Sequence, residues 1–134
     1  MEVSFLLNRE SPGATDGIYA ANCPTRTVLD HVTSKWGVLV LVALAQESLR
    51  WGELRRTVEG ISEKMLASTL RTLEADGFVH REAQATIPPR VDYSLTPLGH
   101  DLADRMLPLM DFIAEHATDI VAGTAKAHPS LVSN

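Results

Sequence analysis

Residues 51–96 read WGELRRTVEGISEKMLASTLRTLEADGFVHREAQATIPPRVDYSLT. The apolar spacing in this segment predicts a short helix, a tight turn, a longer helix and then two strands joined by a loop. That order is typical of a helix-turn-helix followed by a wing, a module that places one helix in a groove of DNA. We call residues 51–96 the reading head.

The first expected helix of the reading head is short and ends in a turn. Trp51, Leu54 and Val58 recur at helical spacing. Gly60 can adopt the left-handed conformation that ends a helix and redirects the chain. Ser62 is then a suitable N-cap, because its hydroxyl can accept a hydrogen bond from a free amide one turn later.

The second expected helix has one apolar and one polar face. Its apolar stripe is formed by Leu66, Leu70 and Leu73, and the Asp76-Gly77 pair ends it. The opposite face is either a solvated surface or a surface that reads a DNA groove. The turn, the cap and the following hairpin are in register, which favours the second interpretation. That face carries Lys64, Ala67, Ser68 and Arg71.

The wing is expected from the last part of the reading head. Residues 91–95 alternate apolar and polar side chains, which predicts a half-buried strand paired with residues 78–83. The loop between them contains Pro88-Pro89, which donate no ladder hydrogen bonds and should hold it extended. Arg90 at the wing base could reach phosphates or the minor groove, or could simply pair with an acid.

The whole chain has the composition of one globular domain. It has 134 residues, of which 45% are hydrophobic and 22% are charged. Its longest apolar run, residues 38–45, is far shorter than the ~20 residues that span a bilayer, and we expect neither a membrane segment nor a signal peptide. The single cysteine, Cys23, excludes an internal disulfide framework and suits the cytoplasm.

The net charge of −5 at first argues against DNA binding. The charges are unevenly distributed, because residues 50–90 hold seven of the twelve Lys and Arg residues against six acids. Residues 92–119 hold six acids and only Arg105 as a base. The sequence therefore predicts a neutral-to-basic reading head and an acidic C-terminal helix.

The N-terminal part begins with an arm, residues 1–22, to which we assign no chemistry and which we expect to dock on the body or on a second subunit. A helix should follow Cys23-Pro24, with Thr25 or a neighbour as its cap. Its buried stripe should be Val28, Leu29 and Val32.

Two further helices are expected around the reading head. Residues 36–44 are apolar nearly all round, as in a central helix, and residues 45–50 should connect it to the reading head. Thr96-Pro97 should start the last helix, Pro108 should kink or break it, and Gly123 should end it. This helix has nothing left in the chain to pack against, which predicts a homodimer. Its apolar positions are Leu98, Leu102, Met106, Leu109, Phe112 or Ile113, and Ile120.

An ordered set of motifs lies between residues 23 and 122. It comprises Cys23-Pro24, Lys35-Trp36, Glu53-Leu54-Arg55-Arg56, Gly60-Ile61-Ser62 with Lys64 and Leu66, LRTLEADGFVHR and PPRVDYSLTPLG. In this set the chain resembles the HxlR-type winged-helix transcription regulators, relatives of the MarR group. The resemblance implies a mainly α winged helix-turn-helix with a small β-hairpin, a dimer built by the terminal helices, and a palindromic operator in double-stranded DNA.

The expected organisation is thus an arm (1–22), a winged helix-turn-helix domain (23–122) with a dimerisation helix (97–122), and a C-terminal tail (123–134). Two positions depart from the family pattern. Gly52 stands where a hydroxyl-bearing cap is common, and Thr33-Ser34 replaces a frequent glycine pair.

The resemblance also implies the residues that face DNA. Lys64 and Ser68 are expected near base edges, and Arg55 and Arg56 on phosphates. The full predicted set is Arg55, Arg56, Ser62, Lys64, Met65, Ser68, Arg71 and Arg90.

Cys23 is the candidate sensor. It precedes a helix N-terminus and has Arg26 nearby, and both would favour the thiolate. Several members of the family sense oxidants or electrophiles through a cysteine at this position. Because this chain has no second thiol, the remaining routes are a Cys23–Cys23 bond across a dimer, alkylation, or a mixed disulfide with a small thiol. The alternative is a small packed residue that senses nothing.

A cavity between the dimer helices and the reading head could bind a small-molecule effector, although its lining side chains are more often plain core. The five histidines show no metal-ligand spacing, and we find no phosphate loop, nucleophile motif or acid-base pair. We therefore predict no metal, no cofactor and no enzyme. The candidate cavity residues are Trp36, Trp51, Tyr93, Met106, Met110 and Phe112.

The predicted function is a homodimeric, sequence-specific DNA-binding transcriptional regulator, cytoplasmic and associated with the nucleoid. We expect it to respond to a small molecule or to thiol-reactive or oxidative stress. Two alternatives remain: a winged-helix protein-interaction module with an inactive DNA face, and an effector-binding dimer with little DNA affinity. A steep fall in DNA affinity with rising salt would favour the regulator.

Overall fold

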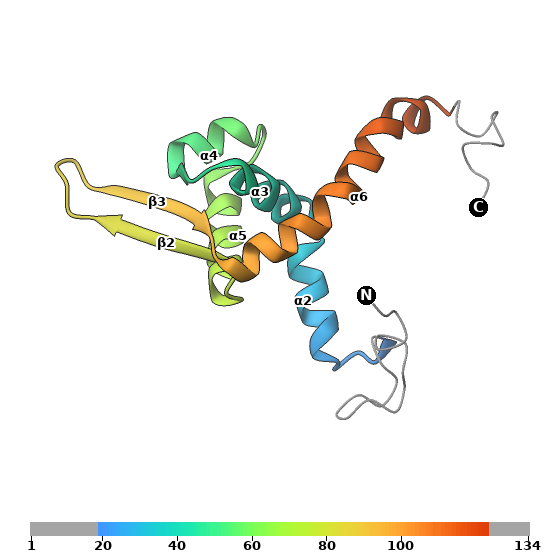
Figure 1. Ribbon diagram of the computed structural model, residues 1–134, viewed down its shortest axis with the longest axis horizontal. Helices are drawn as coiled ribbons and strands as arrows, with labels where there is room; N and C mark the ends of the chain where they lie inside the picture. Colours follow the sequence, from blue (N-terminus) through green and yellow to red (C-terminus); the bar gives the residue numbers. More distant parts are fainter. Residues whose placement is uncertain (1–18, 124–134) are drawn as a thin grey trace.

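The computed structural model describes residues 19–123, and the predicted docking of the arm and the course of the tail lie outside the described residues. The structure is mainly helical with a small antiparallel sheet (Figure 1), so the predicted winged helix-turn-helix is confirmed. The elements in chain order are α2 (Pro24–Val32), α3 (Lys35–Gln46), β1 (Leu49–Arg50), α4 (Trp51–Thr57), α5 (Glu63–Ala75), β2 (Val79–Gln84), β3 (Arg90–Leu95) and α6 (Pro97–Ala122).

Helix α3 is the central element of the core, as its all-round apolar sequence predicts. Val40, Leu41 and Leu44 are almost completely buried, and α3 packs on both α5 and α6. The Ser34 hydroxyl caps α3 by accepting a hydrogen bond from the Gly37 amide at 3.1 Å. The serine of the unusual Thr33-Ser34 pair therefore supplies a helix cap.

Helices α2 and α3 meet at an angle of 70°. Within residues 19–123, no single helix is long and apolar enough to cross a membrane; the bent α2–α3 pair reaches that length and composition. The N-cap of α2 is Cys23, within the segment where Thr25 or a neighbour was expected. The expected burial of Val28 and Leu29 is wrong, since they are 39% and 46% exposed, because no element of the same described chain covers that face.

The helix-turn-helix follows its sequence signals closely. Gly60 has a φ of 88°, and the Ser62 hydroxyl accepts a hydrogen bond from the Met65 amide at 3.0 Å. The start of α4 differs from the expectation drawn from Gly52. Arg50 is the N-cap, and its amide is satisfied by the Glu53 carboxylate at 2.8 Å.

The sheet contains one strand that the sequence did not predict. Its order is β1-β3-β2, and the expected connection before the reading head includes β1, which pairs Leu49 with Tyr93 and Arg50 with Asp92. The wing pairs β2 with β3 from Val79 opposite Leu95 outward, close to the predicted strands. Strands β2 and β3 project from the body as the wing (Figure 1), and β1 joins the sheet at its base.

Helix α6 runs through Pro108 without interruption, so of the expected kink or break the break is wrong, and a kink stays a prediction. Pro108 is exposed, and a carbonyl that loses its amide partner on an exposed face can be hydrated. Thr96 caps the start and Gly123, with a φ of 79°, ends the helix, as predicted. The second half of α6 extends away from the body (Figure 1). It exposes Leu109, Phe112, Ile113, Ile120 and Val121.

Candidate nucleic-acid interface

Helix α5 presents a polar face whose direction is fixed by burial of the opposite face. Leu66, Leu70 and Leu73 are at most 3% exposed, so the helix can turn only one side to solvent. The residues of this segment that are predicted to face DNA are all exposed. They are Ser62, Lys64, Met65, Ser68 and Arg71.

Two of these side chains, Ser62 and Met65, have a further property that suits contact with DNA. The Ser62 hydroxyl already accepts the Met65 amide as the helix cap, which leaves its own hydrogen available to donate to a phosphate or a base. Met65 is 40% exposed, and an exposed flexible thioether suits contact with apolar groups such as a thymine methyl.

The three predicted phosphate-binding arginines are exposed, and two of them pair with acids. The Arg55 Nη1 atom lies 3.3 Å from the Glu63 Oε2 atom, and both of these side chains are well exposed. Such surface pairs contribute at most about 1 kcal/mol, so a phosphate can replace the carboxylate. Arg90 Nε lies 3.1 Å from Asp92 Oδ1, which is the acid pairing that the sequence left as an alternative. Arg56 is exposed on α4.

Asp92 organises the wing base. Besides Arg90, it accepts a hydrogen bond from the Gln84 amide nitrogen at 2.6 Å. Its side chain is 21% exposed, and it stands opposite Arg50 in the β1–β3 ladder. The Asp92 carboxylate therefore contacts Gln84 and Arg90, at the two ends of the wing loop, and lies beside a second arginine, Arg50.

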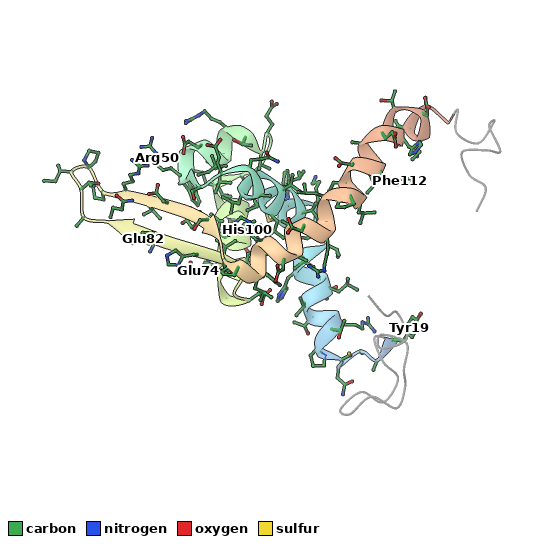
Figure 2. The ribbon with its side chains drawn as sticks, in the orientation of Figure 1. Tyr19, Arg50, Glu74, Glu82, His100 and Phe112 are labelled. Carbon is green, nitrogen blue, oxygen red and sulfur yellow. The ribbon has the colours of Figure 1, made fainter. Side chains whose placement is uncertain are left out.

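Two adjoining hollows bring four arginines to one side of the molecule. The larger, about 500 Å³, lies between residues 50–52 and the wing loop, and Arg50 and Arg90 line it. The second, about 450 Å³, is lined by Arg55 and Arg56, and the two hollows share Trp51 and Gly52. Sequence reasoning missed Arg50, whose position between α4 and the wing is visible in Figure 2.

A third, smaller hollow of about 180 Å³ lies where the α2–α3 turn meets α5. Asp30, His31 and Ser34 line one wall, and Met65 and Ser68 belong to the other. Close by, His31 Nδ1 lies 2.6 Å from Asp76 Oδ2 and ties the last turn of α2 to the C-cap of α5. The helix that starts at Cys23 is therefore in direct contact with the helix proposed to read DNA.

Cys23 lies at the N-cap of α2 with only 6% of its surface exposed. A hydrogen bond from the Thr25 hydroxyl is the main cause that holds the pKa of the Cys23 thiol below its ordinary value. Backbone hydrogen bonds from Thr25 and Arg26 also lower this pKa, and the charge of Arg26, whose guanidinium donates to the Tyr19 carbonyl oxygen at 3.1 Å, is the smallest of these causes. The predicted direction is confirmed, with a different main cause.

The predicted effector-cavity residues have unlike surroundings in one subunit. Tyr93 and Met106 are buried in the core, and Trp36 and Trp51 pack against it. Phe112 is 56% exposed on the distal half of α6. Met110 is half-buried. An effector cavity formed with a second subunit stays a prediction.

A family model described as HxlR-like helix-turn-helix matches residues 31–120 of the chain. The HTH-type transcriptional regulator YtfH of Escherichia coli (strain K12) is 49% identical over 105 residues, which are 78% of this chain and 83% of that protein.

Solved structures agree with the fold. The transcriptional regulator ytfH from Salmonella typhimurium has 48% identity and a TM-score of 0.75, over 80% of this chain and 96% of that one. The redox regulator HypR in its oxidized form has 36% identity and a TM-score of 0.64, over 69% of this chain and 96% of that one. Over the residues that align with these structures, the chain is similar to regulators that contain a helix-turn-helix.

Proposed function

The chain belongs to the HxlR-like helix-turn-helix family of transcriptional regulators, and on that premise we propose that it binds a palindromic operator as a homodimer. The observation that carries the proposal is the exposed polar and basic face of α5, opposite a fully buried leucine stripe. In a helix-turn-helix, such a face enters the major groove.

Side chains on α5 supply the sequence preference in this proposal. Lys64 and Ser68 contact base edges, and Met65 offers an apolar surface to a thymine methyl. Arg71, two helical turns after Lys64, contacts a base or the DNA backbone at the edge of the groove. All four side chains are exposed in the free subunit, so binding needs no rearrangement of the core.

The arginines around the two hollows hold the phosphate backbone in this proposal. Arg55 and Arg56 lie on α4 beside α5, and Arg90 lies at the wing base, with Arg50 added by its position in the larger hollow. Phosphate contacts fix the orientation of the protein on the duplex but carry no sequence information directly. Their number sets the salt dependence of binding.

Dimerisation is proposed through α2 and α6. Val28 and Leu29 on α2, and Phe112 and Ile113 on α6, are between 39% and 56% exposed. Exposed apolar side chains grouped along a helix in this way are typical of a subunit interface. A two-fold dimer would present two copies of α5 to two half-sites about one helical turn apart.

A thiol-based signal is the second part of the proposal. The lowered pKa of Cys23 increases its thiolate fraction at neutral pH, and the thiolate is the form that reacts with oxidants. The similar protein HypR is named a redox regulator. Without a second cysteine in the chain, the reaction would form a bond between two subunits or a mixed disulfide. A small-molecule effector at the dimer is the alternative signal.

Operator binding is the experiment that tests the proposal. The full chain would select duplexes from a random-sequence pool, and fluorescence anisotropy would measure binding to the enriched duplex at two salt concentrations. We expect a palindromic site, a steep salt dependence, and loss of sequence preference in Lys64→Ala.

The matched control is Arg105→Ala. Arg105 lies on α6, where its guanidinium donates to the Asp101 carbonyl oxygen of its own helix at 2.9 Å. This substitution removes the same charge as a reading-head variant and should leave operator binding unchanged. If no duplex is enriched, the DNA-binding proposal fails and a winged-helix interaction module becomes the better description.

A further inference from the structure

The tip of the wing carries a completely exposed isoleucine. Ile87 is 101% exposed, at the end of a hairpin whose strands have six residues each. At about 3.3 Å per residue, the wing extends ~20 Å, and it points away from the helices (Figure 1). Isoleucine is among the residues most often buried, so its position at the far end of this arm needs a reason.

The tip has a defined shape in the free subunit. The Thr86 hydroxyl donates to the Pro88 carbonyl oxygen at 2.8 Å, and the Thr86 amide donates to the Gln84 carbonyl oxygen at 2.9 Å. Pro88 and Pro89 follow Ile87 directly and restrict the backbone further. A loop backbone restrained in this way loses little conformational freedom on binding.

Cationic side chains stand directly behind the apolar tip. Ile87 lines the same 500 Å³ hollow as Arg50 at the end of β1 and Arg90 at the start of the neighbouring strand β3. Asp92 holds the Arg90 guanidinium in position at 3.1 Å. An apolar point backed by two arginines fits a polyanion with an apolar interior, and double-stranded DNA has that structure: stacked bases between rows of phosphates.

We propose that Ile87 is an apolar wedge that enters the minor groove beside the half-site and partly unstacks one base step. The inference deepens the proposed function and rests on it. Apolar side chains inserted in this way kink the duplex, and pyrimidine–purine steps unstack most easily. Ile87 therefore adds a preference for a deformable step, outside the bases that α5 touches.

The test uses the full chain and the duplex that it selects from a random-sequence pool. Adenines flanking each half-site are replaced one at a time by 2-aminopurine, whose fluorescence rises when its base is unstacked. With the natural chain we expect a rise at one step per half-site. Ile87→Ala should abolish the rise and weaken binding by about tenfold, since it removes the apolar surface that the bases cover.

Two further variants separate the wedge from a general effect on binding. Ile87→Met keeps a long apolar side chain and should keep the fluorescence rise. Leu39→Ala removes another exposed apolar side chain, on α3 and outside the proposed interfaces, and should change neither fluorescence nor affinity. Because Ile87 makes no buried contact, its replacement should leave the thermal midpoint unchanged.

The outcomes are distinguishable from failure of the proposed function. Operator binding with no fluorescence rise at any position, or a rise that persists in Ile87→Ala, overturns the wedge and leaves the regulator intact. Failure to enrich any duplex overturns both proposals.

Discussion

Replacement of Arg56 by alanine should reduce the salt dependence of operator binding by a calculable amount. Arg56 is exposed on α4 and lines the hollow beside α5, where a phosphate would lie. Each phosphate contact contributes about 0.9 to the slope of log affinity against log salt concentration. A dimer contains two copies of the residue, so Arg56→Ala should lower the slope by about 1.8.

This difference is large enough to measure. For a fourfold rise in salt, a slope change of about 1.8 corresponds to about a tenfold smaller loss of affinity than the natural chain shows. Fluorescence anisotropy with the selected duplex and with an unrelated duplex gives both slopes. The reduction should be the same on the two duplexes, because phosphates carry no base identity.

Arg55 gives an informative comparison. Its removal would also leave Glu63, which is 72% exposed, without its partner at 3.3 Å and facing the DNA. Arg55→Ala should therefore weaken binding more than Arg56→Ala at low salt. An Arg56→Ala variant with altered sequence preference and an unchanged salt slope would refute the assignment of Arg56 to phosphate. A similar slope change in Arg105→Ala would show that only net charge matters.

Four further predictions concern stability, assembly and the signal. Gly99→Ala should lower the free energy of unfolding in urea by about 1–3 kcal/mol, because a Cβ at this position would overlap the Phe78 carbonyl oxygen. In the control Gly52→Ala the nearest atom would be 3.5 Å from the new Cβ, so the free energy of unfolding should not change. Phe112→Asp should shift the dimer to monomer in light scattering with intact far-UV circular dichroism, since the side chain is 56% exposed in one subunit; an unchanged mass would exclude α6 from the interface. Cys23→Ser should bind the operator normally and lose any release by diamide; a retained response would end the sensor hypothesis. The thiol of Cys23, with its lowered pKa, should also reach its maximal alkylation rate at a lower pH than the same cysteine in urea.

The parts of the fold that the sequence predicts well are those with their own periodicity or chemistry. The leucine stripe of α5, the Ser62 cap and the positive φ of Gly60 all depend on residues within a few positions of each other. Strand β1 could not be predicted, because two residues have no period and its existence depends on pairing with β3, more than forty residues later. Arg50 was missed for the same reason.

The wrong expectation for α2 has a different physical cause. The spacing of Val28 and Leu29 correctly identifies an apolar face, but periodicity does not tell whether the covering element belongs to the same chain. The sequence assigned α6 to a partner subunit on the argument that nothing remained to cover it; that is wrong for its first half, which packs on α3 and buries Ala103 and Met106, and applies only to the distal half. The exposed stripe of α2 extends that argument to a second helix.

The distribution of charge in three dimensions resolves the conflict between a net charge of −5 and DNA binding. Exposed charges act mainly within a Debye length, which is about 8–10 Å at physiological salt. Helix α6 has 26 residues and so extends ~39 Å, with its distal half beyond the body, and acids such as Asp111 and Glu115 lie on that half. A phosphate near the reading head would instead meet Arg50, Arg55, Arg56 and Arg90 around the two adjoining hollows, where it would replace the acids paired with three of them, Glu53, Glu63 and Asp92. The acidic helix therefore lowers the isoelectric point and keeps non-specific attraction weak, while the exposed arginines of the reading head provide cations with which a phosphate can pair.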